Sequence, residues 1–277
     1  MNIKFLIVTF LLIQITSFAQ IEIPKASPDA SVSQVIGFTN VMVEYNRPQI
    51  KGRDMLQDLT REGEVWRTGA NLATRLTLSE EIYIEDQLIP KGKYSLYSIR
   101  TGDEWTLIIN KEVSWGTTYN EKKDFLRIKV PTLKSKVANE SHTFYFSNVT
   151  EETGVLGFAW GEYKVEFKLR VDIHNKILSK IDEVMKNEKT AVDMDFYNAS
   201  SYYMKKKLDS GKALHWATVF VDKRKNNELH WHLVLKANAL IYAGRKNEAL
   251  PIYKLALEKA KATNKGDAIY NLSLIHI

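Results

Sequence analysis

The spacing of apolar residues changes once along this chain, and the change divides it into two regions. From Ser31 to about Leu169, apolar residues mostly alternate with polar ones, whereas after Asp172 they recur with a helical period. Alternation buries one face of a strand, and a period near 3.6 buries one face of a helix. Residues 20–171 are therefore predicted to be mainly β, an antiparallel sandwich or barrel of about eight to ten strands. Residues 172–271 are predicted to be all-α and built from helical hairpins.

Two long stretches interrupt the alternation in the predicted β region. They cover residues 47–73 and 111–124. Each is long for a loop in a compact domain, and long ordered loops often carry binding or catalytic residues. The functional site is therefore expected in these two loops.

The helical region ends in a hairpin with a tetratricopeptide-like spacing. Gly244 is placed to end one helix, and Ala249, Tyr253 and Ala256 then follow at intervals of four and three. Small residues at such positions let two helices approach closely while the aromatic ring fills the space between them. The same pattern also suits a short helical bundle, and both interpretations stay open.

Both ends of the chain are predicted to lie outside the fold. Residues 1–19 have a positive start, an apolar centre and small residues before Gln20, which are the features of a signal peptide. Export to the periplasm, the outer-membrane surface or the medium is therefore expected. Residues 272–277 match the translation of a common sequencing adapter, and we interpret them as an artefact of sequence assembly.

The cysteine content and the charge distribution limit how the protein can be stabilised and what it can bind. None of the 277 residues is a cysteine, so a stable fold must depend on core burial without disulfides. The net charge is −1 over residues 20–171 and +6 over residues 172–277, so the basic excess belongs to the helical region. Its lysine runs lack the dense stripe and stacking aromatics of a nucleic-acid surface. We expect neither nucleic-acid binding nor a transmembrane segment.

Familiar catalytic signatures are missing from the sequence. It has no nucleophile elbow, no phosphate-binding glycine loop and no paired metal-binding histidines, so neither a cofactor nor a metal is predicted. The acid–base candidates near the loops are Glu44, Asp54, Glu64 and Asp124. Two carboxylates about 5 to 10 Å apart across a cleft would suit glycoside hydrolysis. An enzyme therefore stays an alternative without a specific motif behind it.

Cationic and aromatic residues are concentrated in the two loops. Guanidinium groups match a carboxylate or a phosphate, aromatic rings offer flat faces to a sugar, and an amide can orient it. In a competing structural interpretation, the arginines bond neighbouring acids and loop carbonyls while the tryptophans seal the core. The candidate ligand-binding residues are Arg47, Lys51, Arg53, Trp66, Arg67, Asn71, Trp115 and Tyr119.

Several sequence blocks resemble one exported bacterial family. The blocks are Ala26-Ser27-Pro28, Gln34-Val35-Ile36-Gly37, Tyr45-x-Arg47-Pro48-x-x-Lys51-Gly52-Arg53, Trp66-Arg67-Thr68-Gly69-Ala70-Asn71, Pro90-x-Gly92-x-Tyr94-x-Leu96, Trp105 to Asn110, and Trp115-Gly116 before Tyr119. Over residues 25–169 the chain is similar to the family catalogued as domain of unknown function 2911, which is typical of Bacteroidetes-type bacteria. The resemblance implies an exported protein, with a helical tail as in some members. It implies no activity, because none is established for the family.

The leading hypothesis is a non-catalytic binding module for a small anionic or carbohydrate-like ligand. One alternative is an enzyme that modifies an envelope glycan or lipid, and another is a scaffold whose helical tail binds a protein partner. The binding hypothesis depends on one spatial expectation. The loop that ends near Thr74 and the loop around Tyr119 should meet and leave room between them.

Overall fold

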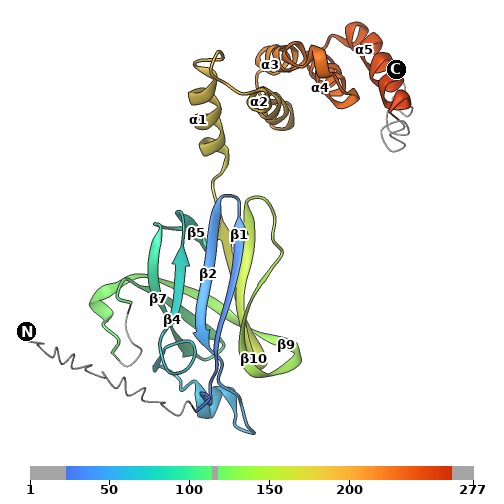
Figure 1. The fold of residues 1–277 in the computed structure, drawn as a ribbon. Coiled ribbons are helices and arrows are strands. Elements are labelled where there is room, and N and C mark those ends of the chain that lie inside the picture. Colours follow the sequence, from blue (N-terminus) through green and yellow to red (C-terminus); the bar gives the residue numbers. More distant parts are fainter. Residues whose placement is uncertain (1–22, 114–117, 264–277) are drawn as a thin grey trace, which may run out of the picture. The chain divides into compact units, whose positions relative to one another are not determined.

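The computed structural model describes residues 23–113 and 118–263 of the chain (Figure 1). The chain divides into two compact units, with the boundary between Asp172 and Ile173. The predicted signal peptide, Trp115 and residues 272–277 lie outside the described residues. The predicted fold class is confirmed within the described ranges, where an antiparallel sheet of ten strands is followed by five α-helices.

The strands of the first unit, here the β unit, form one antiparallel sheet. Along the sheet the order is β1-β2-β4-β7-β8-β9-β10-β5-β6, and β3 pairs with β7 off this path. The strands are β1 (Asp29–Ile36), β2 (Thr39–Asn46), β3 (Val65–Trp66), β4 (Thr74–Leu78), β5 (Ile82–Ile84), β6 (Gln87–Ile89), β7 (Gly92–Thr101), β8 (Glu104–Asn110), β9 (Asp124–Ser147) and β10 (Thr153–Arg170). Short turns η1 (Met55–Leu59) and η2 (Glu121–Lys123) lie in the two long loops.

Strand β9 is long enough to serve both halves of the sheet. Its first part pairs with β8, where Leu126 lies opposite Ile109. Its later part pairs with β10, where Phe144 lies opposite Phe158. The β9–β10 register shifts on either side of Gly161, whose φ of +59° bends β10 at that point.

The core of the β unit forms where the apolar faces of the strands meet. The predicted alternation is confirmed in β10, where Val165, Phe167 and Leu169 are at most 1% exposed. Aromatic rings fill the centre, and Trp105 of β8 lies edge to face with Phe158 of β10 at 5.7 Å. Each such pair contributes about 0.5–1.5 kcal/mol beyond the burial of its surface. Burial of this kind stabilises the unit without disulfides.

The helices of the second unit pack on their neighbours in sequence. α2 contacts α3, α3 contacts α4, and α4 contacts α5. Ala249, Tyr253 and Ala256 of α5 are buried, and Tyr253 donates a hydrogen bond to Asn238 of α4. Gly244, with a φ of +76°, follows α4 in the left-handed conformation that ends a helix. The helices are α1 (His174–Met185), α2 (Asp193–Lys205), α3 (Ser210–Lys223), α4 (His230–Tyr242) and α5 (Lys246–Ala262), with the short turn η3 (Lys225–Asn227) before α4.

A helix that spans a bilayer needs about 20 consecutive, mostly apolar residues. Across the described ranges, none is both long and apolar enough to cross a bilayer.

Candidate functional site

Arg47 binds the edge of β9. Its Nε donates to the carbonyl of His142 at 3.2 Å, and its Nη2 donates to the Thr143 hydroxyl at 2.7 Å. Backbone bonds continue the contact, since the His142 N–H donates to the Pro48 carbonyl at 2.9 Å. Arg47 therefore joins the first loop to β9.

The other two arginines of the first loop donate to carbonyls of their own loop. Arg53 donates to the carbonyls of Gln49 and Ile50 at 2.7 and 2.9 Å. Arg67 donates to the Asn71 carbonyl at 2.6 Å. The backbone N–H of Lys51 donates to the Glu140 carboxylate of β9 at 2.8 Å. The three arginines thus satisfy protein oxygens at separate points and are not gathered around one shared space.

Trp66 and Asn71 hold neighbouring segments together. The Trp66 ring stacks on Trp160 at 5.7 Å and 13°, and its Nε1 donates to the Gly69 carbonyl at 3.0 Å. The Asn71 amide donates to the Ser27 carbonyl at 3.2 Å. Asn71 itself is exposed, whereas Trp66 is half-buried.

Tyr119 lies in a hydrogen-bonded network in the second loop, and Trp115 lies outside the described residues. The Tyr119 hydroxyl donates to Asp124 at 2.6 Å and accepts from Arg127 at 2.8 Å. Asp124 also accepts from Arg127 Nε at 2.8 Å and from the Asn110 amide at 2.7 Å. Burial, followed by the bond to Asp124, raises the pKa of Tyr119 to about 12. This network fixes the second loop on β8 and β9.

The ends of the two loops do come together. Ala73 from the first loop and Tyr119 from the second pack in one small cluster with Tyr97 and Ile108. The Tyr119 and Tyr97 rings lie 5.0 Å apart at 64°. Ala73, Tyr97 and Ile108 are all buried, so the contact is close packing without a gap at this point.

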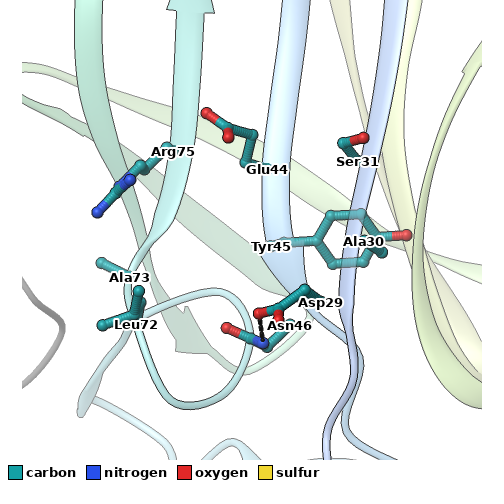
Figure 2. Close-up of a pocket in the computed structure, with 9 residues that line it drawn as sticks. All are labelled: Asp29, Ala30, Ser31, Glu44, Tyr45, Asn46, Leu72, Ala73 and Arg75. Carbon is teal, nitrogen blue, oxygen red and sulfur yellow. Dashed lines mark hydrogen bonds between the residues drawn. The ribbon is translucent and has the colours of Figure 1, made fainter. Parts of the chain in front are cut away.

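An open pocket of about 470 Å³ lies beside this contact (Figure 2). Most of its side chains belong to the face of β1, β2 and β4 that points away from the core, and we call it the outer-face pocket. Its lining residues are Asp29, Ala30, Ser31, Glu44, Tyr45, Asn46, Leu72, Ala73 and Arg75.

Segments from three of the sequence blocks meet at the outer-face pocket. The Asn46 amide donates to the Ser27 carbonyl at 3.2 Å and to Asp29 at 2.6 Å. Asn71 donates to the same Ser27 carbonyl. This one oxygen therefore connects the segment before β1 to both β2 and the first loop. A Cβ at Gly69 would lie 3.3 Å from the Asn46 carbonyl, so glycine permits the loop to approach β2 this closely.

Charges of both signs line the pocket. Lys25 pairs with Asp29 at 2.7 Å. Hydrogen bonds from Lys25 and then from Asn46 hold the pKa of Asp29 below its ordinary value, so this carboxyl is ionised. Glu44 and Arg75 lie opposite each other on β2 and β4, but the Arg75 guanidinium extends away from the Glu44 carboxylate (Figure 2).

Sequence reasoning placed the site in the loops and named Glu44 only as an acid candidate. The other pocket residues were missed. Leu72 and Ala73 lie in the first loop without charge or aromatic character, and the rest stand on strands, where composition does not single them out. One signal was available, since Glu44 lies between the core residues Val43 and Tyr45 and therefore faces outward.

The remaining acid candidates have structural contacts. Asp54 accepts from the backbone of Leu56 and Gln57 at the start of η1, and Glu64 lies 3.8 Å from Arg61. Asp124 belongs to the Tyr119 network. Among the described residues, no group of three or more histidine, aspartate or glutamate side chains is arranged to hold a metal ion.

One of three comparisons with known proteins finds a match, and it covers the segments of the sequence blocks that meet at the pocket. Comparison with curated proteins finds no match, and comparison with solved structures finds none. The family model for DUF2911, described as a protein of unknown function, matches residues 27–169. This match includes every residue that lines the pocket and covers more than half of the 277-residue chain, and the chain therefore belongs to the DUF2911 family.

Proposed function

We propose that the β unit is a non-catalytic binding module that holds a small carbohydrate-like molecule in the outer-face pocket. The observation that carries the proposal is the pocket itself, where planar polar groups stand on three adjacent strands at the meeting point of the family's sequence blocks. Its volume of about 470 Å³ falls within the range of small-molecule sites.

The chemistry of the lining favours a hydroxyl-rich ligand. A carboxylate and a hydroxyl can each hydrogen-bond to the hydroxyl groups of a sugar, and Glu44 and Ser31 supply one of each. Leu72 offers apolar surface to the C–H groups of a sugar ring. The strands that hold these residues are hydrogen-bonded in register, so the groups are preorganised.

An anionic ligand has less support. Arg47, Arg53 and Arg67 donate to protein oxygens, and the pocket combines two carboxylates with one guanidinium. Catalysis also has less support, because the lowered pKa of Asp29 makes that carboxyl a poor general acid. Export and a protein partner for the helical unit stay predictions.

The test is a screen of the purified protein against an array of mono- and oligosaccharides, followed by calorimetric titration of each hit. Ser31→Phe should fill the pocket from the exposed face of β1 and weaken binding about tenfold or more. Ser33→Phe is the matched control, since Ser33 is also exposed on β1 but does not line the pocket.

The screen separates the alternatives. Binding that survives Ser31→Phe unchanged would place the sugar elsewhere. A protein that ignores the array but binds acidic metabolites would favour the anionic alternative instead.

A further inference from the structure

Most hydrogen-bond donors around the outer-face pocket are already engaged. The Asn46 amide gives its hydrogens to Ser27 and Asp29, and Lys25 donates to both Asp29 oxygens at 2.7 and 3.0 Å. Arg75 also has an interaction within the protein. A ligand therefore meets few donors that can turn toward it.

Two polar groups keep free capacity. Within the described part of the chain, neither the Glu44 carboxylate nor the Ser31 hydroxyl has a hydrogen-bond or ion-pair partner. The two residues lie directly opposite each other in the β1–β2 register, so their Cβ atoms are about 5 Å apart on one face. The free capacity of the pocket is thus mainly that of an acceptor, with a negative charge at its centre.

The charge at Glu44 distinguishes between classes of sugar. An acidic sugar would bring a third negative charge beside Glu44 and Asp29, and the like charges would repel. A neutral sugar would make ordinary hydrogen bonds to Glu44. A protonated amine would make a charge-assisted bond, which is about twice as strong as a neutral one.

We propose that the ligand is an amino sugar with a free, protonated amino group, and that this group binds Glu44 while a ring hydroxyl binds Ser31. The inference rests on the proposed function, because it takes the same pocket as the binding site. An N-acetylated sugar would lose this bond, since acetylation removes the positive charge.

The test uses three tetrasaccharides that share a β-1,4-linked glucose backbone and differ at carbon 2. They carry a free amine, an N-acetyl group or a hydroxyl. Each is titrated calorimetrically into the purified full-length protein at a pH where the amine is protonated. The free-amine sugar should bind about tenfold tighter than the other two, and added salt should reduce the difference.

Glu44→Gln should abolish this preference, because it removes the charge while keeping the shape of the side chain. Glu162→Gln is the matched control. It makes the same charge change at an exposed β10 residue that has no partner within the described ranges. The control should bind all three sugars as the parent protein does.

The outcomes separate this inference from the proposed function. Equal binding of all three sugars, unaffected by Glu44→Gln but blocked by Ser31→Phe, would overturn the amine preference and leave the carbohydrate site in place. Tighter binding of a neutral sugar would have the same meaning. Binding of no saccharide in either experiment would overturn both.

Discussion

The imidazole of His142 lies 5.2 Å from the indole of Trp66, and the two rings meet edge to face at 82°. His142 is fully buried, and neither ring nitrogen has a hydrogen-bond partner in the described part of the chain. Burial, followed by the charge of Arg47, lowers the pKa of His142 to about 3. The ring is therefore neutral in the folded protein over the physiological range.

This burial predicts that the β unit loses stability in mild acid. The pKa of an unfolded histidine is about 6.5, so below that pH the unfolded chain binds a proton that folded His142 does not. The free energy of unfolding should fall as the pH drops from about 6.5 toward 3, by up to about 1.4 kcal/mol per pH unit. Above about pH 6.5 both states are neutral, and His142 adds no pH dependence. Urea denaturation across this range, read by hydrogen exchange of β8 and β10, measures the slope.

His142→Phe should remove much of that acid dependence while keeping an aromatic ring in the core. His215→Gln is the control, because His215 is exposed on α3 and contacts Glu188 in the helical unit. An acid slope in His142→Phe as steep as in the parent protein would show that other groups cause it.

Removal of the Tyr119 hydroxyl should destabilise the second loop. Tyr119→Phe keeps the ring contact with Tyr97 but loses the bonds to Asp124 and Arg127. The expected cost is about 1–3 kcal/mol, since both partners are charged. Tyr83→Phe is the control, because the Tyr83 ring contacts Arg170 and its hydroxyl has no hydrogen-bond partner among the described residues. Urea denaturation of both variants gives the comparison, and equal stabilities would contradict a role for the network.

The strands were predictable because their spacing alone encodes which face is buried. Val165, Phe167 and Leu169 alternate with charged residues whatever their partners are. The candidate site was not predictable in this way. Glu44 can be recognised as outward-facing, but its position between Ser31 and Arg75 depends on strand pairing between distant segments.

The arginines show the same limit in the loops. Composition marks Arg53 and Arg67 as candidate ligand contacts, yet each donates to a carbonyl only four residues or fewer away. These bonds depend on the path of the loop backbone, and the spacing of apolar residues in the sequence does not encode that path. The expected meeting of the two loop ends does have a counterpart, in the contact between Ala73 and Tyr119.

Substitution of Arg47 tests whether this residue acts on the fold or on a ligand. Arg47→Lys keeps the charge but cannot reach His142 and Thr143 at once, so we expect a loss of about 1–3 kcal/mol in stability. Sugar binding should persist in the folded variant. Arg53→Lys is the control, because Arg53 is exposed and donates to carbonyls of its own loop, and it should cost less than about 1 kcal/mol. Normal stability with lost binding would assign Arg47 to the ligand instead.

Close packing between α4 and α5 predicts that the helical unit cannot accept a larger side chain at Ala256. This residue is 0% exposed, and Leu255 beside it is 42% exposed. Ala256→Leu should cost about 1–3 kcal/mol because the added carbons must displace packed neighbours. Leu255→Ala changes the same kinds of side chain at the surface and should stay within about 0.5 kcal/mol. Thermal unfolding followed by helical circular dichroism compares them. If Ala256→Leu melts like the parent protein, the two helices are not in close contact there, and the small-residue spacing no longer supports a tetratricopeptide-like hairpin.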